Sequence, residues 1–212
     1  MLRHRVLAIA TACACCAVPA IVLAAPKPPT TTVTISVSQG AVTFGKAVTI
    51  SGTTTANTAV TLRGDAFPFN NSFAQVAKTT SNAAGAYSFT VTPDTSTHYR
   101  ADAKKAKSPV AALAVRWKVT RKVSTKHPKR GSRVQFSGLV SPAHNGGTAS
   151  IQRRSGGVWK TVKTTTLAAS TATSSAYAVR IRVRRNGTYR VRVEGDGAHD
   201  AGNSSTVKLT VH

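Results

Sequence analysis

The second half of the chain repeats its first half, and this repeat limits the fold more than any other feature. The segment that ends at Gly52 returns 86 positions later at Gly138, and the segment that begins at Tyr87 returns 90 positions later at Tyr177. A period of this length belongs to a unit large enough to bury a core of its own. The sequence therefore predicts two copies of one module in tandem.

Within each copy, apolar residues alternate with polar ones, as in residues 87–91 and 207–211. Alternation with a period of two places every second side chain on one face, as in half-buried β-strands. Glycine, asparagine and proline interrupt the alternation at short intervals, as expected for tight turns. About seven strands per copy predict an all-β fold of two tandem immunoglobulin-like antiparallel β-sandwiches, over residues 33–115 and 116–212.

Three segments, residues 42–52, 82–89 and 186–191, resemble strands of bacterial immunoglobulin-like repeat domains. The resemblance covers nearly all of the chain after residue 25 and is specific to a fold rather than to a ligand. It implies that Tyr99 and Tyr189 are corner tyrosines whose hydroxyl groups bond to nearby backbone. The three cysteines all lie among the first 16 residues, so the resemblance is to the bacterial class without disulfides.

Residues 1–24 have the pattern of a signal peptide. Two arginines precede a run of apolar and small residues, and the residues before the bond after Ala24 suit a signal peptidase. An uncleaved membrane anchor and a lipid anchor on Cys13 are the alternatives. The proline-rich residues 25–32 are predicted to form an extended spacer. We therefore expect a secreted protein that is extracellular or associated with the cell envelope.

Positive charge is concentrated in the second copy. Residues 25–115 contain eight Lys or Arg against three acidic residues, whereas residues 116–212 contain nineteen against three. Such an excess favours polyanions, and arginine suits phosphate and carboxylate because its guanidinium donates to two oxygens at once. The alternative is that the charge only solubilises the protein and protects its strand edges. No specific nucleic acid is expected, because aromatic residues are sparse and no groove-reading helix is evident.

The arginines follow the strand alternation. In residues 179–184 the apolar side chains must face a core, so the arginines between them point outward. The arginines in residues 189–193 point outward for the same reason. A two-residue hairpin would set Arg182 opposite Val191 and mix the two faces. Either the loop is longer or the chain crosses between sheets, and the immunoglobulin topology favours the crossing. The predicted polyanion-binding residues are these two rows and a cluster around the turn at residues 128–131: Arg180, Arg182, Arg184, Arg190, Arg192, Lys126, Lys129, Arg130 and Arg133.

The chain has no constellation of residues for catalysis. Three of its six acidic residues lie in the glycine-containing loop of residues 194–200. That loop has the oxygen ligands for calcium, but its composition favours a turn before the last strand. The histidines lack the spacing of a zinc site. The sequence therefore predicts a protein that is not an enzyme and has neither a metal site nor a cofactor.

The two tryptophans carry the remaining alternatives. Trp117 follows the first copy without a flexible linker and is predicted to pack at the junction or into the first strand of the second copy. For Trp159, alternation does not decide between an exposed position and the core.

We expect a non-enzymatic structural or adhesive module held at the cell envelope by its basic second copy, which binds an anionic wall polymer or acidic glycan. The alternative is a carbohydrate-binding or receptor-like module with ligand contacts from loops or from Trp159.

Overall fold

The computed structural model describes residues 31–212. The regular secondary structure of residues 31–212 consists entirely of β-strands, so the all-β prediction is confirmed. No helix within residues 31–212 has the length and apolar character to cross a membrane. The predicted signal peptide and most of the predicted spacer lie outside the described residues.

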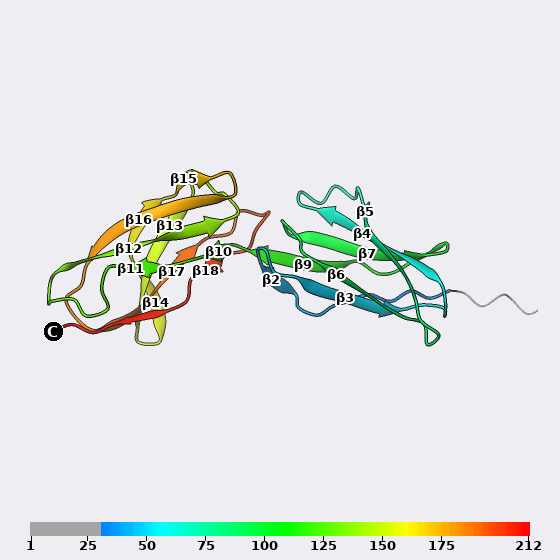
Figure 1. The fold of residues 1–212 in the computed structure, drawn as a ribbon, viewed down its shortest axis with the longest axis horizontal. Helices are drawn as coiled ribbons and strands as arrows, with labels where there is room; N and C mark the ends of the chain where they lie inside the picture. Colours follow the sequence, from blue (N-terminus) through cyan, green and yellow to red (C-terminus); the bar gives the residue numbers. More distant parts are fainter. Residues whose placement is uncertain (1–30) are drawn as a thin grey trace, which may run out of the picture. The chain divides into compact units, whose positions relative to one another are not determined.

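The strands of the first copy form two sheets, which we call the first sheet pair (Figure 1). One sheet has the order β1-β3-β6, and the other has the order β2-β9-β7-β4-β5 with β8 beside β7. The strands are β1 (Ser36–Val37), β2 (Ala41–Thr43), β3 (Val48–Thr53), β4 (Ala59–Ala66), β5 (Ala74–Thr80), β6 (Ala86–Val91), β7 (Thr97–Ala103), β8 (Ala106–Lys107) and β9 (Ala111–Arg116).

The strands of the second copy form two further sheets, the second sheet pair. One has the order β10-β12-β16-β15 with β11 beside β12, and the other has the order β14-β13-β17-β18 with β19 beside β17. The strands are β10 (Lys118–Val119), β11 (Lys122–Val123), β12 (Arg133–Ser141), β13 (Thr148–Ser155), β14 (Val158–Thr166), β15 (Ala168–Thr171), β16 (Ser174–Arg182), β17 (Gly187–Val193), β18 (Gly202–Asn203) and β19 (Val207–Leu209).

The first sheet pair encloses its own hydrophobic core. Strand β6 alternates between exposed and buried residues along its whole length, as the sequence predicted. Its Phe89 meets Ile50 of the same sheet and Leu62 of the other sheet in one buried cluster. Side chains from two facing sheets therefore interdigitate, which is the packing of a β-sandwich.

The second sheet pair encloses a separate core, in which Phe136, Ile151 and Leu209 are fully buried. Trp117 belongs to this core, and its indole Nε1 donates a hydrogen bond to the carbonyl oxygen of Glu194 at 2.9 Å. The prediction that Trp117 packs into the core is therefore confirmed. Only Trp117 separates β9 from β10, so no flexible linker lies between the two copies.

A glycine and a tyrosine hold the first strand of the first copy. Gly52 of β3 lies directly opposite Tyr87 of β6, and the Tyr87 hydroxyl donates to the carbonyl oxygen of Thr34. A Cβ atom on Gly52 would overlap both that carbonyl and the tyrosine ring. The strand pair therefore needs glycine at this position, because only the missing side chain leaves room for the hydroxyl to reach the backbone.

The second copy repeats this contact atom for atom. Gly138 of β12 lies opposite Tyr177 of β16, and the Tyr177 hydroxyl donates to the carbonyl oxygen of Thr120 at 2.7 Å. In both copies the threonine hydroxyl also accepts a backbone N–H from the residue after the glycine, at 2.8 Å. The sequence repeat is therefore a repeat of structure.

The prediction that Tyr99 and Tyr189 are corner tyrosines bonded to backbone is wrong. Tyr99 and Tyr189 are buried, but the tyrosine hydroxyls that bond to backbone within residues 31–212 are those of Tyr87 and Tyr177. The Tyr99 and Tyr189 hydroxyls instead lie near side chains, the former near Thr97 and the latter near arginines of the second copy. Two tyrosines recur in each copy, and the sequence does not indicate which of them reaches the backbone.

The prediction of about seven strands per copy is too low, because the first copy has nine and the second has ten. The additional strands are pieces of two or three residues. For example, β10 and β11 both pair with β12 and are separated where the Thr120 carbonyl bonds to a tyrosine hydroxyl instead of to the neighbouring strand.

Replacing Gly52 with alanine tests the glycine–tyrosine contact. We expect Gly52→Ala to lower the free energy of unfolding by roughly 1–3 kcal/mol, because the new methyl group displaces the Thr34 carbonyl and the Tyr87 ring. Gly40→Ala is the matched control, since no atom lies within 4 Å of its Cβ position. Equal denaturation midpoints for the two variants would contradict this account.

The tyrosines also predict a loss of stability at alkaline pH. Burial raises the pKa of Tyr87 from 10.0 to about 12, and it also raises the pKa of Tyr99, Tyr177 and Tyr189. Between pH 10 and 12 the unfolded chain loses phenolic protons that the folded chain keeps, so the free energy of unfolding falls as the pH rises. Denaturation at a series of pH values should show this fall, and Tyr87→Phe should make it shallower.

Candidate polyanion-binding cleft

Strands β16 and β17 belong to different sheets, because β16 pairs with β12 whereas β17 pairs with β13. The predicted crossing between sheets is therefore confirmed. Ile181 of β16 and Val191 of β17 are both buried in the second core. The arginines between the buried residues of each strand therefore lie on the outer faces of two different sheets.

On the outer face of β12 and β16, cations are direct cross-strand neighbours. Arg133 lies opposite Arg182, and Gln135 lies opposite Arg180. Val134 and Ile181, which alternate with them, are buried, so this register fixes the guanidinium groups on the solvent side. Like charges directly opposite each other destabilise a strand pair unless something neutralises them.

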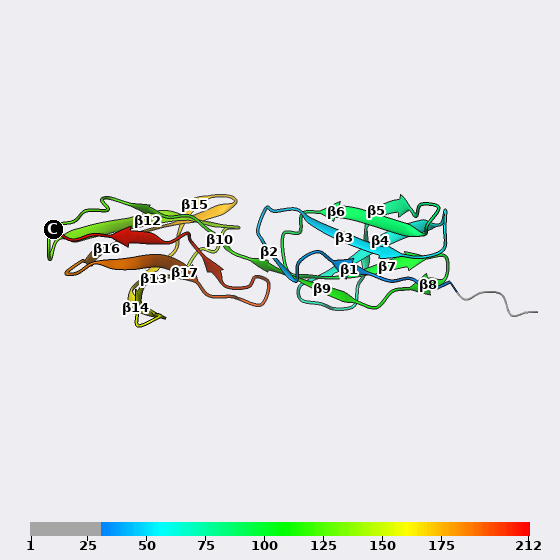
Figure 2. The same cartoon turned by 90° about the horizontal axis from the view of Figure 1, so that it is seen from below.

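This face borders a hollow of about 1030 Å³, which we call the cleft. Its other wall comes from β13 and β14, whose hairpin tip projects beyond the neighbouring strands (Figure 1; Figure 2). Seven cationic side chains and no acidic side chain line the cleft. The cations are Arg133, Arg153, Lys163, Arg180, Arg182, Arg184 and Arg185.

Two of the three acidic residues of the second sheet pair contact side chains that do not line the cleft. Glu194 forms a two-point ion pair with Arg192, at 2.6 and 2.7 Å, and the hydrogen bond from Arg192 lowers the pKa of the Glu194 carboxyl. Asp196 lies 3.5 Å from His199 and 3.9 Å from His144. Among residues 31–212, the ion pairs include none of the cleft cations.

Tyr189 belongs to the second core and also lines the cleft. Burial raises the pKa of its hydroxyl, while the positive charges of Arg153 and Arg185 oppose that shift. Arg153 is also the direct neighbour of Tyr189 in the β13–β17 ladder. The two arginines therefore converge on one point of the wall.

Only four of the predicted site residues line the cleft: Arg133, Arg180, Arg182 and Arg184. The second predicted row lies on the outer face of the other sheet and is already engaged. Arg190 donates to the Gln152 side chain at 2.8 Å, and Arg192 is paired with Glu194.

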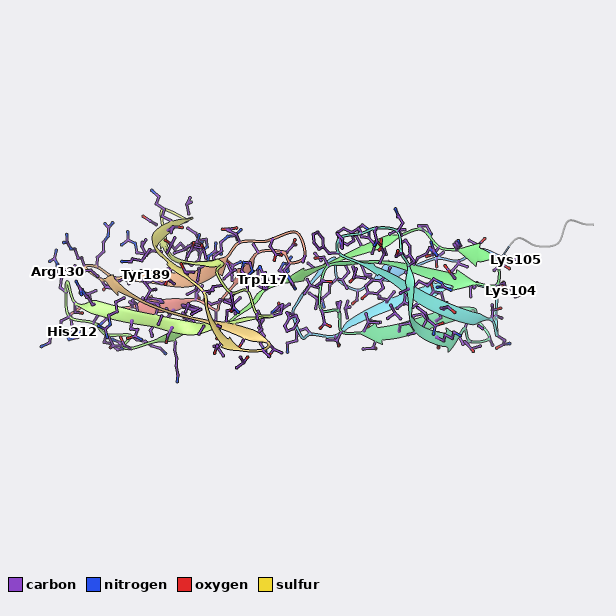
Figure 3. All side chains as sticks on the ribbon, turned by 90° about the horizontal axis from the view of Figure 1, so that it is seen from above. Lys104, Lys105, Trp117, Arg130, Tyr189 and His212 are labelled. Carbon is purple, nitrogen blue, oxygen red and sulfur yellow. The ribbon has the colours of Figure 1, made fainter. Side chains whose placement is uncertain are left out.

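The predicted turn cluster is a third location. Lys126, Lys129 and Arg130 do not line the cleft. The backbone N–H of Arg130 donates to the carbonyl oxygen of His212 at 3.0 Å, so this turn lies beside the end of the chain (Figure 3). Of the turn cluster, only Arg133 reaches the cleft.

Sequence reasoning missed three cleft cations, which are Arg153, Lys163 and Arg185. The first two come from β13 and β14, far from the arginine-rich strands in the sequence, and only the packing of the hairpin against β16 brings them close. Arg185 directly follows Arg184 and breaks the alternation. A search for outward arginines therefore had no reason to select these residues.

Trp159 lies in neither of the predicted environments. It is half-buried and does not belong to the second core. The guanidinium carbon of Arg190 lies 4.3 Å from the centre of its ring, a cation–π contact. One ring face is therefore covered by a side chain of the protein itself.

Polar groups of the loop of residues 194–200 bond to other parts of the protein and to one another. Asp196 accepts the backbone N–H of His199 at 2.9 Å, and the His199 ring stacks on Trp117 with ring centres 4.1 Å apart. Within residues 31–212, no three His, Cys, Asp or Glu side chains are grouped as a metal site requires.

No protein-family model and no curated protein matches the chain. Among solved structures, that of the native conformation of E. coli alpha-2-macroglobulin is similar to it, with a TM-score of 0.38 and 9% sequence identity. The similarity covers 86% of this chain and 17% of that chain.

The two tryptophans predict different losses of stability. Trp117→Ala should lower the free energy of unfolding by roughly 3–5 kcal/mol, because it leaves a large cavity in the core. Trp159→Ala should cost about 1 kcal/mol, the size of a partly exposed cation–π contact. Chemical denaturation of both variants measures the difference, and similar losses would contradict the surface position of Trp159.

Proposed function

We propose that the second sheet pair binds an anionic polymer in the cleft, and that this binding retains a secreted, non-enzymatic module at the cell envelope. The observation that carries the proposal is the lining, in which seven cations and no acidic side chain surround one hollow. Gathering like charges costs free energy unless anions neutralise them. A polymer with many oxyanions supplies that neutralisation, and guanidinium groups bind oxyanions through two hydrogen bonds each.

The first copy of the repeat is an internal comparison for the cleft. Tyr87 and Tyr99 correspond to Tyr177 and Tyr189 with a constant offset of 90 positions, and the strand registers extend this correspondence to the neighbouring strands. None of the seven counterparts of the cleft cations is itself a cation. They are Ala47, Gly64, Ala77, Thr90, Thr92, Asp94 and Thr95.

This comparison indicates that the fold does not depend on the cleft cations. The first sheet pair forms its core and its strand ladders with six uncharged residues and one aspartate at the same places, so folding does not require arginine there. The alternative is that the charge serves solubility alone. A solubilising charge acts best when it is dispersed over the surface, whereas six arginines and one lysine share a single hollow here.

The wider proposal is a protein of two tandem immunoglobulin-like domains, residues 33–115 and 116–212, which follow a signal peptide and a proline-rich spacer. Two separate cores and the repeated glycine–tyrosine contact support this division. The signal-peptide pattern of residues 1–24 supports secretion. A sugar stacked on Trp159 has less support, because Arg190 already covers one face of that ring.

Replacing two cleft arginines with the residues of the first copy tests the proposal. We expect Arg180→Thr/Arg182→Thr to weaken binding to inorganic polyphosphate, because two guanidinium contacts are lost. The slope of log K against log salt concentration should become shallower by about 1.4, because each of the two lost contacts with a single-stranded polyanion contributes about 0.7.

Wild-type protein should also be retained on purified cell envelopes and released by moderate salt.

The matched control removes the same charge outside the cleft. Lys129→Thr/Arg130→Thr also deletes two cations, but neither residue lines the hollow. We expect its salt slope to stay within error of the wild-type value. Equal losses in the two double variants would show that only net charge matters and would overturn the proposal.

A further inference from the structure

The cleft continues into a second, smaller hollow of about 260 Å³. Arg133, Gln135 and Arg180 line both hollows, whereas Lys163 lines only the larger and Ser124 only the smaller. The combined groove therefore runs from β14 across β16 and β12 to Ser124, which follows β11. A path that crosses several strands suits an elongated ligand better than a small anion.

Neutral polar groups continue the row of cations on this path. Gln135 lies directly opposite Arg180 and two residues from Arg133 in its own strand, and Ser124, whose hydroxyl accepts the backbone N–H of Gln135, lines the far end. An amide both donates and accepts hydrogen bonds, and a hydroxyl does the same. Such groups complement hydroxyl groups of a ligand, which a row of cations alone does not.

The wall opposite the arginines carries exposed apolar surface. Val162 of β14 lines the cleft and is 45% exposed. Its position comes from a β-bulge, because Gln152 pairs with Thr161 and Ile151 pairs with Lys163, which leaves Val162 without a partner in the ladder. The bulge allows Val162 and Lys163, which are consecutive, to face the same hollow.

The first copy has the same bulge, with an unpaired and exposed valine, but a glycine lies beside it in place of an arginine. Val76 of β5 is skipped in the ladder in the same way. Its side chain packs over Gly64, since a Cβ atom on that glycine would lie 3.0 Å from Val76 Cγ2. In the second copy Arg153 occupies the place of Gly64, so the exposed valine there adjoins guanidinium groups.

From these three features, and on the basis of the proposed function, we infer that the polymer is an acidic glycan. It is a linear chain of sugar or polyol units that carry oxyanion groups, and it lies across β16 and β12. The arginines bind the oxyanions, Gln135 and Ser124 bind hydroxyl groups, and Val162 contacts the apolar face of a sugar unit. Inorganic polyphosphate has no apolar face, so it binds through its oxyanions and gains nothing from Val162.

The test compares two polyanions that differ in this respect. Dissociation constants are measured at one salt concentration for heparin, a sulfated glycan, and for inorganic polyphosphate. We expect Val162→Thr to weaken heparin binding about fourfold, the effect of losing the burial of about one methyl group, and to leave polyphosphate binding unchanged. Arg180→Thr should weaken binding of both polymers about tenfold.

The matched control is Val158→Thr, because Val158 lies in the same strand and is 60% exposed but does not line the cleft. It should change neither affinity. If Val162→Thr behaves like this control, or weakens both polymers equally, the glycan inference is overturned while the effect of Arg180→Thr still supports the proposed function. If Arg180→Thr changes neither affinity, the proposed function itself fails.

Discussion

In each copy of the repeat, a tyrosine hydroxyl reaches past a glycine to hold the carbonyl oxygen of a threonine that precedes or interrupts the first strand. The contact joins three segments that are distant in the sequence, and it works only because the glycine has no side chain. Each of these bonds is partly buried, so losing it leaves a carbonyl and a hydroxyl with reduced access to water, which costs free energy. The chain has no cysteine after residue 16, so packing and hydrogen bonds of this kind must hold the sheets together.

The crossing of the chain between β16 and β17 determines where the charge lies. Because consecutive strands enter opposite sheets, arginines that are close in the sequence separate onto two outer faces. One row meets a lysine and an arginine brought by the β13–β14 hairpin and forms the cleft. The other row is engaged by Gln152, Trp159 and Glu194. The same residue type therefore has two different roles, which depend on the neighbours that the fold supplies.

The two copies show how one scaffold supports different surfaces. Inward positions keep their apolar character in both copies, as in the pairs Ile50 and Phe136 or Leu62 and Ile151. Outward positions are free to change, because they face solvent in the strand ladders. In the first copy Arg63 and Arg100 bond to Asp102, whereas the cleft of the second copy gathers arginines with no acidic side chain in its lining. Charge has thus been added to the fold without altering its core.

The sequence by itself determined the all-β class, the tandem repeat, and the inward and outward faces of β16 and β17, because alternation and repetition are visible along the chain. The crossing between the two strands followed only when the immunoglobulin topology was added to the mismatch of faces in a two-residue hairpin. The sequence also indicated that Trp117 is buried. Tertiary structure alone decided which tyrosines reach the backbone, how Trp159 is covered, and which cations share the cleft. Arg153 and Lys163 join Arg180 only through the bulged β13–β14 hairpin, and a contact between segments so far apart in the sequence depends on packing rather than on periodicity.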